Sequence, residues 1–210
     1  MMRKRLTREE SREQTTKHLL DAGQKLIAQK GLSATSVEDI AAAAGYSRGA
    51  FYSNFDTKYD LFIEILRRDH LDTHDRFMAL CDDGLPFEQL TGRVRELYGQ
   101  QYRNDESFLN WAEARIVAAR DPEFRARLRE VDAEKRRDID GVVEYIFRRA
   151  GGAPPLPPAV MAMGFVSLIE GVKLAMLATP DDVTQDSAEA VLSVFLDAIL
   201  RQTVQRDAAQ

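Results

Sequence analysis

Apolar side chains recur every three to four positions along most of the chain, which is the spacing of one face of an α-helix. Residues 19–27 show the pattern first, with Leu19, Leu20, Leu26 and Ile27 on one stripe. We find no run of alternating apolar and polar residues between hairpin turns, which is the pattern of a β-strand. The sequence therefore predicts an all-α protein of about nine helices.

Turn and capping residues divide the first part of the chain into a long helix, two short helices and the start of another long one. The short helices are expected over residues 37–44 and 48–53, and Gly45 between them can adopt the left-handed conformation of a turn. The first long helix is expected to start at Ser11 or Thr15 and to end at Lys30, with Gly31 as its stop. Ser36 and Ser47 are expected to cap the two short helices, with Asp39 as the capping-box acid of the first. Asp56 or Thr57 is expected to cap the second long helix, which runs toward Cys81.

Two short helices joined by a tight turn are typical of a helix-turn-helix unit. Ala41 lets the second helix approach the first closely, and Ile40 and Phe51 can share a core. The outward face of the second helix can then enter the major groove of DNA. On this face Arg48 can form two hydrogen bonds with guanine, and Gly49 lets the backbone lie close to the base edges. Hydroxyl, amide and ammonium groups that can donate to phosphates are those of Ser36, Tyr46, Tyr52, Asn54 and Lys58.

The charge of the chain is unevenly distributed. The total is -5, but residues 1–60 hold ten Lys and Arg against eight Asp and Glu, whereas the remainder holds nineteen against twenty-six. This argues against a general nucleic-acid coat and places any DNA-binding surface in the first part of the chain. Alternatively, this part is a helical subdomain whose cations are only solvated, although that leaves an outward Tyr52 without a packing role. Arg3, Lys4 and Arg5 form either a minor-groove arm or an idle tail.

The stretch ATSVEDIAAAAGYSRGAFYSNF at residues 34–55, followed by Lys58 and Leu61, closely resembles the signature of tetracycline-repressor-type (TetR) regulators. The resemblance covers residues 15–62 and implies an all-helical homodimer. It implies a three-helix DNA-binding domain, here residues 1–61, and an effector-binding and dimerisation domain, here 62–210. At Asn54 the sequence departs from the histidine of many members. The DNA-contacting positions that the resemblance implies are Ser36, Tyr46, Ser47, Arg48, Gly49, Tyr52, Asn54 and Lys58.

Residues 159–179 form the longest apolar run and are apolar nearly all round a helix. Glu170 and Lys173 inside the run argue against a membrane span, because each costs about 2.5 to 3.5 kcal/mol at the centre of a bilayer. With the final helix, over about 186–205, the run is expected to form a four-helix bundle across a two-fold axis. The alternative is burial in the core of a monomer. The expected interface residues are Gly164, Gly171, Val191, Phe195 and Ile199.

The middle of the chain carries aromatic side chains that could enclose a small-molecule effector, which the family resemblance also places there. An alternative for each is an ordinary core position. The residues expected to bind the effector are Tyr98, Tyr102, Phe108, Trp111, Arg115 and Phe165.

His70, His74 and Cys81 lie on one side of the same expected helix, and the spacing of the two histidines suits a metal ion. Cys81 lies about two turns beyond His74, which is too far to coordinate the same ion without help. We therefore favour solvated or pocket-lining histidines, and we expect no metal and no cofactor.

Catalytic motifs are missing from the sequence, including the Gly-x-Ser-x-Gly nucleophile turn, His-Glu-x-x-His and a phosphate-binding loop. We therefore expect not an enzyme but a repressor that a small molecule releases from double-stranded operator DNA. A dimeric sensor or scaffold without DNA binding is the remaining alternative. The single cysteine and the charged start of the chain, without the apolar segment of a signal peptide, indicate a cytoplasmic protein.

Overall fold

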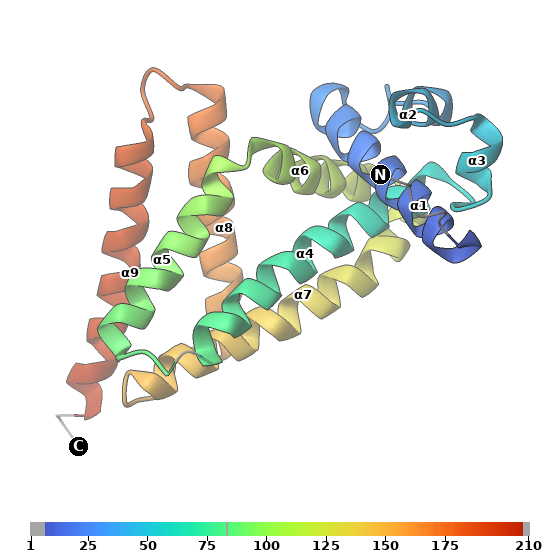
Figure 1. The fold of residues 1–210 in the computed structure, drawn as a ribbon. Coiled ribbons are helices and arrows are strands. Elements are labelled where there is room, and N and C mark those ends of the chain that lie inside the picture. Colours follow the sequence, from blue (N-terminus) through green and yellow to red (C-terminus); the bar gives the residue numbers. More distant parts are fainter. Residues whose placement is uncertain (1–6, 83, 208–210) are drawn as a thin grey trace, which may run out of the picture. The chain divides into compact units, whose positions relative to one another are not determined.

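The computed structural model describes residues 7–82 and 84–207, and over these residues the chain forms nine α-helices and no strand (Figure 1). The all-α architecture is thereby confirmed. Side chains at 82, 95, 98–103, 196–197 and 199–207 lie outside the description. The helices are α1 (Arg8–Lys30), α2 (Val37–Ala44), α3 (Arg48–Tyr52), α4 (Lys58–Asp82), α5 (Phe87–Arg103), α6 (Asp105–Arg120), α7 (Pro122–Arg149), α8 (Pro158–Ala178) and α9 (Gln185–Asp207).

The helices assemble into two compact units. Unit 1 comprises Met1–Leu71 and Asp105–Val131, and unit 2 comprises Asp72–Asn104 and Asp132–Gln210. The core of unit 1 extends past residue 61, where we expect the DNA-binding part to end, because α4 buries its next apolar residues against α6 and α7. Those contacts join Phe62, Ile65 and Leu66 to Trp111, Ala114, Phe124 and Leu128.

Helix α1 begins earlier than the sequence pattern predicted. The prediction of a start at Ser11 or Thr15 was wrong, because Thr7 caps the helix. The backbone N–H of Glu10 donates to the Thr7 hydroxyl at 3.1 Å, and the backbone N–H of Thr7 donates to the Glu10 carboxylate at 2.7 Å. The reciprocal pair satisfies two N–H groups that would otherwise have no partner, so the helix extends into a polar segment without an apolar stripe.

Unit 2 has two apolar cores. One joins α4, α5 and α7 through Phe77, Leu90, Val94 and Val142 among others, and the second joins α7 and α8 through Val143, Phe147, Met161 and Ala162. Helix α9 packs beside α8 (Figure 1). These contacts bury only part of the apolar surface that the two last helices carry.

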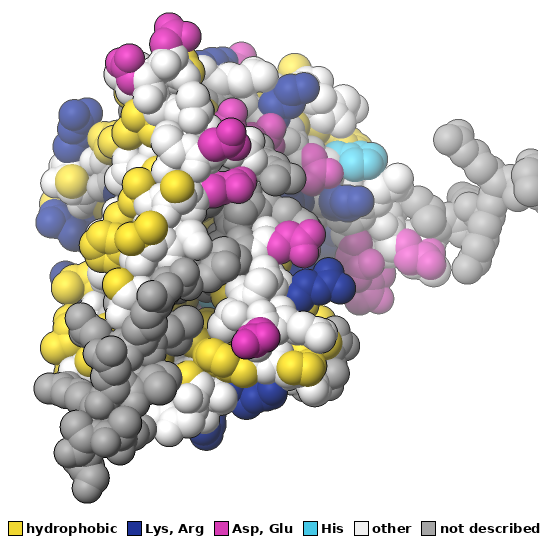
Figure 2. All heavy atoms as spheres, turned by 90° about the vertical axis from the view of Figure 1, so that its left-hand side faces the viewer, with side chains coloured by type: hydrophobic (Ala, Val, Ile, Leu, Met, Phe, Trp, Pro, Cys, Tyr) yellow, Lys and Arg dark blue, Asp and Glu magenta, His cyan; other side chains and the backbone are white. Residues whose placement is uncertain are grey.

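Large apolar side chains remain exposed on α8 and α9. Figure 2 looks onto the α9 side of the molecule, where hydrophobic side chains gather. Among the described residues, α8 is also the one helix long and apolar enough to cross a membrane. However, Lys173 within it is only 4% exposed, so neighbouring protein atoms enclose this one side chain. The exposed apolar residues of the two helices are Val160, Met163, Leu174, Val191, Val194 and Phe195.

Candidate nucleic-acid interface

Helices α2 and α3 form the predicted helix-turn-helix, and each begins at a serine. The Ser36 hydroxyl accepts from the backbone N–H of Asp39 at 3.0 Å, and the Ser47 hydroxyl accepts from that of Ala50 at 3.2 Å. Between the helices Gly45 is left-handed, with φ 79° and ψ 25°. Ala41 is 1% exposed, which allows the close approach that the turn requires. The caps, the turn and the small contact residue that the sequence predicted are therefore confirmed.

The outward face of α3 presents Arg48 and Tyr52 together. The Tyr52 side chain is 46% exposed although it is large and aromatic. The guanidinium carbon of Arg48 lies 5.4 Å from the centre of the Tyr52 ring, within the range of a cation–π contact. A guanidinium Nη1 of Arg48 also lies 2.8 Å from a carboxylate oxygen of Glu38, on α2. Arg48 thus contacts Glu38 on one side and Tyr52 on the other, and its contact with DNA stays a prediction.

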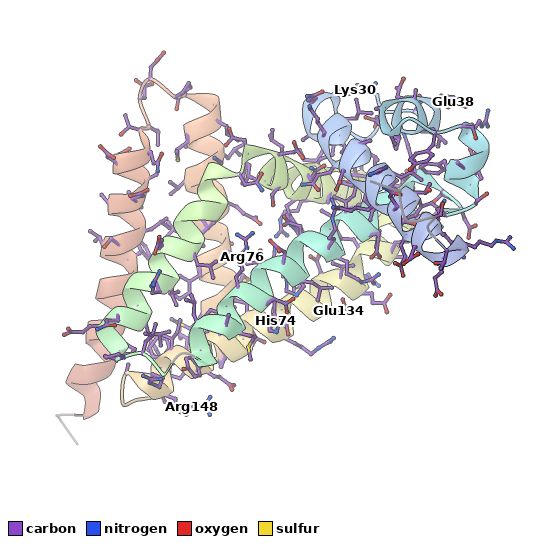
Figure 3. The ribbon with its side chains drawn as sticks, viewed as in Figure 1. Lys30, Glu38, His74, Arg76, Glu134 and Arg148 are labelled. Carbon is purple, nitrogen blue, oxygen red and sulfur yellow. The ribbon has the colours of Figure 1, made fainter. Side chains whose placement is uncertain are left out.

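A second ion pair lies at the start of α2. The Lys30 ammonium lies 2.7 Å from the Asp39 carboxylate, which also accepts from the backbone N–H of Ser36 at 3.1 Å. Figure 3 labels Lys30 at the end of α1 and Glu38 in the first turn of α2. The hydrogen bond from Lys30, followed by those from Ser36, lowers the pKa of Asp39 from 3.8 to about 2. The capping acid therefore stays ionised over the whole physiological range.

Gly49 has no structural need to be a glycine. A methyl group built on its Cα would meet only the Ser47 hydroxyl oxygen, at the ordinary contact distance of 3.7 Å. The residue is exposed and lies within α3, where glycine is a poor helix former. Its surface is open to solvent, and the close approach to DNA that the sequence predicted stays a prediction.

Three of the predicted phosphate donors contact other groups of the protein. The Lys58 ammonium donates to the backbone carbonyls of Leu32 at 2.6 Å and Thr35 at 2.9 Å. Its burial lowers the pKa of Lys58. These bonds use two of the three donors of the ammonium. Lys58 therefore fastens the loop between α1 and α2 to α4, and its contact with DNA stays a prediction.

The other two engaged donors contact α1 or α3. The Asn54 amide donates to the backbone carbonyl of Ala50 at 2.7 Å and accepts from the Thr16 hydroxyl at 2.9 Å. The Tyr46 hydroxyl lies 3.0 Å from Nδ1 of His18. Sequence reasoning missed the partners Thr16 and His18, as it missed Glu38 and Lys30, because they lie on other helices and no local spacing links them.

The residues expected to bind the effector fall into both units. Trp111 in unit 1 is 6% exposed and its indole N–H donates to the Asp69 carboxylate at 2.7 Å. Phe108 is half-buried and Arg115 is exposed. Phe165 in unit 2 packs against the α7–α8 core. The side chains of Tyr98 and Tyr102 lie outside the described residues, so the effector site stays a prediction.

The expected dimer residues lie on helix surfaces of unit 2. Among the described residues, no atom from elsewhere in the chain lies within 4 Å of a methyl group built on Gly164 or Gly171. Val191 is 42% and Phe195 51% exposed. The side chain of Ile199 lies outside the described residues. The four described residues are therefore available to a partner.

The histidines of α4 have protein neighbours. His70 is 6% exposed, and Nδ1 of His74 lies 3.7 Å from the Asp138 carboxylate in unit 2. The Cys81 thiol is half-buried. Over the described part of the chain, no three His, Cys, Asp or Glu side chains are grouped so as to hold a metal ion.

Comparisons with known proteins agree with this geometry. Residues 19–65 match the model of the tetR family of bacterial regulatory proteins, and residues 86–201 match that of the C-terminal part of BetI-type transcriptional repressors. The HTH-type transcriptional regulator AcrR of Shigella flexneri is 49% identical over 61 residues, which are 29% of this chain and 28% of AcrR. The chain thus spans less than a third of that relative.

Solved structures extend the likeness to nearly the whole chain. A transcriptional regulator from Rhodococcus sp. Rha1 superimposes with a TM-score of 0.72 at 22% identity, covering 90% of this chain and 97% of that one. SmeT, the repressor of a Stenotrophomonas maltophilia multidrug efflux pump, in its triclosan complex gives 0.66 at 21%, covering 88% and 90%. At such identities these likenesses show the fold alone.

The paired helices α2 and α3, with the matches to both parts of the chain, define a helix-turn-helix regulator. The second match alone covers more than half of the sequence. The chain belongs to the TetR family of bacterial regulatory proteins.

Proposed function

We propose that the chain is a homodimeric repressor that binds an operator in double-stranded DNA through α3 and leaves it when a small molecule binds to residues 62–210. The exposed face of α3 carries this proposal: an arginine, a glycine without a structural role and a solvent-facing tyrosine stand together at the start of a helix. An arginine can form two hydrogen bonds with guanine O6 and N7, and a bare backbone can approach base edges.

The apolar surface of α8 and α9 supports the homodimer. Exposed valine, methionine, leucine and phenylalanine side chains in one part of a soluble protein mark an association surface. A two-fold axis makes the same patch meet itself, and two copies of α3 can then read half-sites one helical turn apart, about 34 Å. An operator for this protein is therefore expected to be a near-palindrome.

Release by a small molecule is supported by the family. SmeT is known in complex with triclosan, which shows that a protein of this fold can hold a small organic molecule. For this chain, we infer the same mode of regulation with an effector that its residues do not identify. We also propose that it catalyses no reaction and acts in the cytoplasm, where its DNA lies.

Selection of genomic fragments tests this proposal. Sheared DNA from the source organism is incubated with the full chain, and the retained fragments are sequenced. We expect enrichment of a near-palindromic site, and genes beside that site indicate the chemical class of the effector. Retention of fragments in proportion to their abundance would show that the chain does not read sequence and would overturn the proposal.

A further inference from the structure

Two acidic side chains stand next to each other in the first turn of α2 and have different partners. The carboxylate of Asp39 caps α2, because it accepts from the backbone N–H of Ser36, and it also pairs with Lys30. Glu38 has no part in the cap, and its carboxylate reaches across to Arg48 on α3 at 2.8 Å. An acidic residue is generally unfavourable on a surface that meets DNA, so the position of Glu38 beside the reading arginine requires an explanation.

The Glu38–Arg48 pair lies in solvent and can open easily. The side chain of Glu38 is 55% exposed and that of Arg48 is 63% exposed. Ion pairs at this level of exposure shift an equilibrium by no more than about fivefold. Arg48 can therefore leave Glu38 whenever a better partner is offered, and remains paired when none is.

DNA offers Arg48 two kinds of partner. When Arg48 moves from Glu38 to a phosphate, one anionic partner replaces another and the Glu38 carboxylate is left unpaired beside a polyanion. The binding free energy therefore changes little. A guanine offers two acceptors that match the planar guanidinium, so two hydrogen bonds replace one. The exchange is favourable at guanine and close to neutral at a phosphate.

We propose that Glu38 is a specificity-determining residue that holds Arg48 away from the phosphates of unrelated DNA and yields it to guanine in the operator. The inference rests on the proposed function, since it assumes that α3 reads DNA. In unrelated complexes Arg48 makes less than one full phosphate contact, because it stays paired with Glu38 part of the time, whereas in the operator complex it contacts a base.

The salt dependence of binding tests the proposal with Glu38→Gln. On an unrelated duplex, we expect Glu38→Gln to tighten binding about two- to fivefold and to steepen the slope of log K against log salt by up to about 0.9, the value of one complete phosphate contact. On the selected operator, the slope should not change, because Arg48 remains on a base. Glu130→Gln removes the same charge from an exposed position on α7, 77% exposed, and should change neither slope.

Introducing Glu38→Gln into the Arg48→Ala variant separates the effect of the Glu38–Arg48 ion pair from other effects of the Glu38 charge. There Glu38→Gln should no longer steepen the slope, since no guanidinium is left to release. A steeper slope that persists without Arg48, or an equal change in Glu130→Gln, would overturn the inference while leaving DNA reading intact. Absence of any enriched operator for the wild-type protein would instead overturn the proposed function.

Discussion

Arg48 and Gly49 are neighbours at the start of α3, and each has a property that folding alone does not require. Arg48 is exposed and contacts Glu38 and Tyr52 through its guanidinium group. Gly49 leaves open a surface that a methyl group could fill at ordinary contact distance. We therefore propose that both residues serve recognition rather than stability.

Gly49→Ala should separate stability from DNA binding. Alanine is favoured over glycine within a helix by about 0.8–1.0 kcal/mol, so denaturant unfolding should show equal or greater stability. The added methyl group should nevertheless weaken operator binding in a titration, because it stands between the backbone and the base edges. If the variant binds the operator as well as the wild type does, the protein backbone at Gly49 does not lie close to the base edges.

Asp39 makes the stability of the helix-turn-helix depend on pH. Its pKa falls from 3.8 to about 2 on folding, so its ionised form stabilises the fold above pH 3.8, and this contribution is lost as the pH falls through the folded value. Asp39→Asn should lower the thermal midpoint at neutral pH, and the difference from the wild type should shrink between about pH 4 and about pH 2. A difference that stays constant over that interval would contradict the role given to the Lys30–Asp39 pair.

At the scale of the elements, Lys58 links the first turn of α4 to the loop that precedes α2. Its ammonium donates to two backbone carbonyls of that loop, of which the carbonyl of Leu32 also accepts from the backbone N–H of Thr35. Lys58→Met should therefore lower the free energy of unfolding by about 1–3 kcal/mol, as expected when charged hydrogen bonds to buried acceptors are lost. Denaturant unfolding measures this.

Lys25→Met provides the matched control, because Lys25 is an exposed lysine on α1. It should change stability by less than about 0.5 kcal/mol. If Lys58→Met leaves stability unchanged and instead flattens the salt dependence of DNA binding by about one unit of slope, the main role of Lys58 is a phosphate contact after all.

The separation in sequence between interacting residues determined which features of these elements could be predicted. Ser36, Asp39, Gly45 and Ser47 act on residues three or four positions away, so their spacing predicted the caps and the turn correctly. The partner of Arg48 lies on another helix, ten positions earlier in the chain. The carbonyls bound by Lys58 are 26 and 23 positions away, and nothing in a single sequence reveals such tertiary contacts.

At the scale of the whole molecule, the apolar surface of α8 and α9 determines whether one chain can act alone. Phe195→Glu places a charge on that surface and should yield a monomer in sedimentation analysis at micromolar concentration, because an unpaired charge is costly to bury. Leu156→Glu makes the same change at a similarly exposed apolar residue, 53% against 51%, in the segment before α8. It should leave the dimer intact. A wild-type monomer, or a dimeric Phe195→Glu variant, would contradict the proposed interface.

The affinity of Arg48→Ala for the selected operator tests the central claim, that α3 reads DNA sequence, most directly. The matched control is Arg129→Ala, which removes an exposed arginine from α7. Loss of a bidentate contact should weaken operator binding by about 1–3 kcal/mol for each half-site and relax the preference at one base pair, while Arg129→Ala binds as the wild type does. Equal affinity and equal sequence preference in Arg48→Ala and the wild type would contradict the claim.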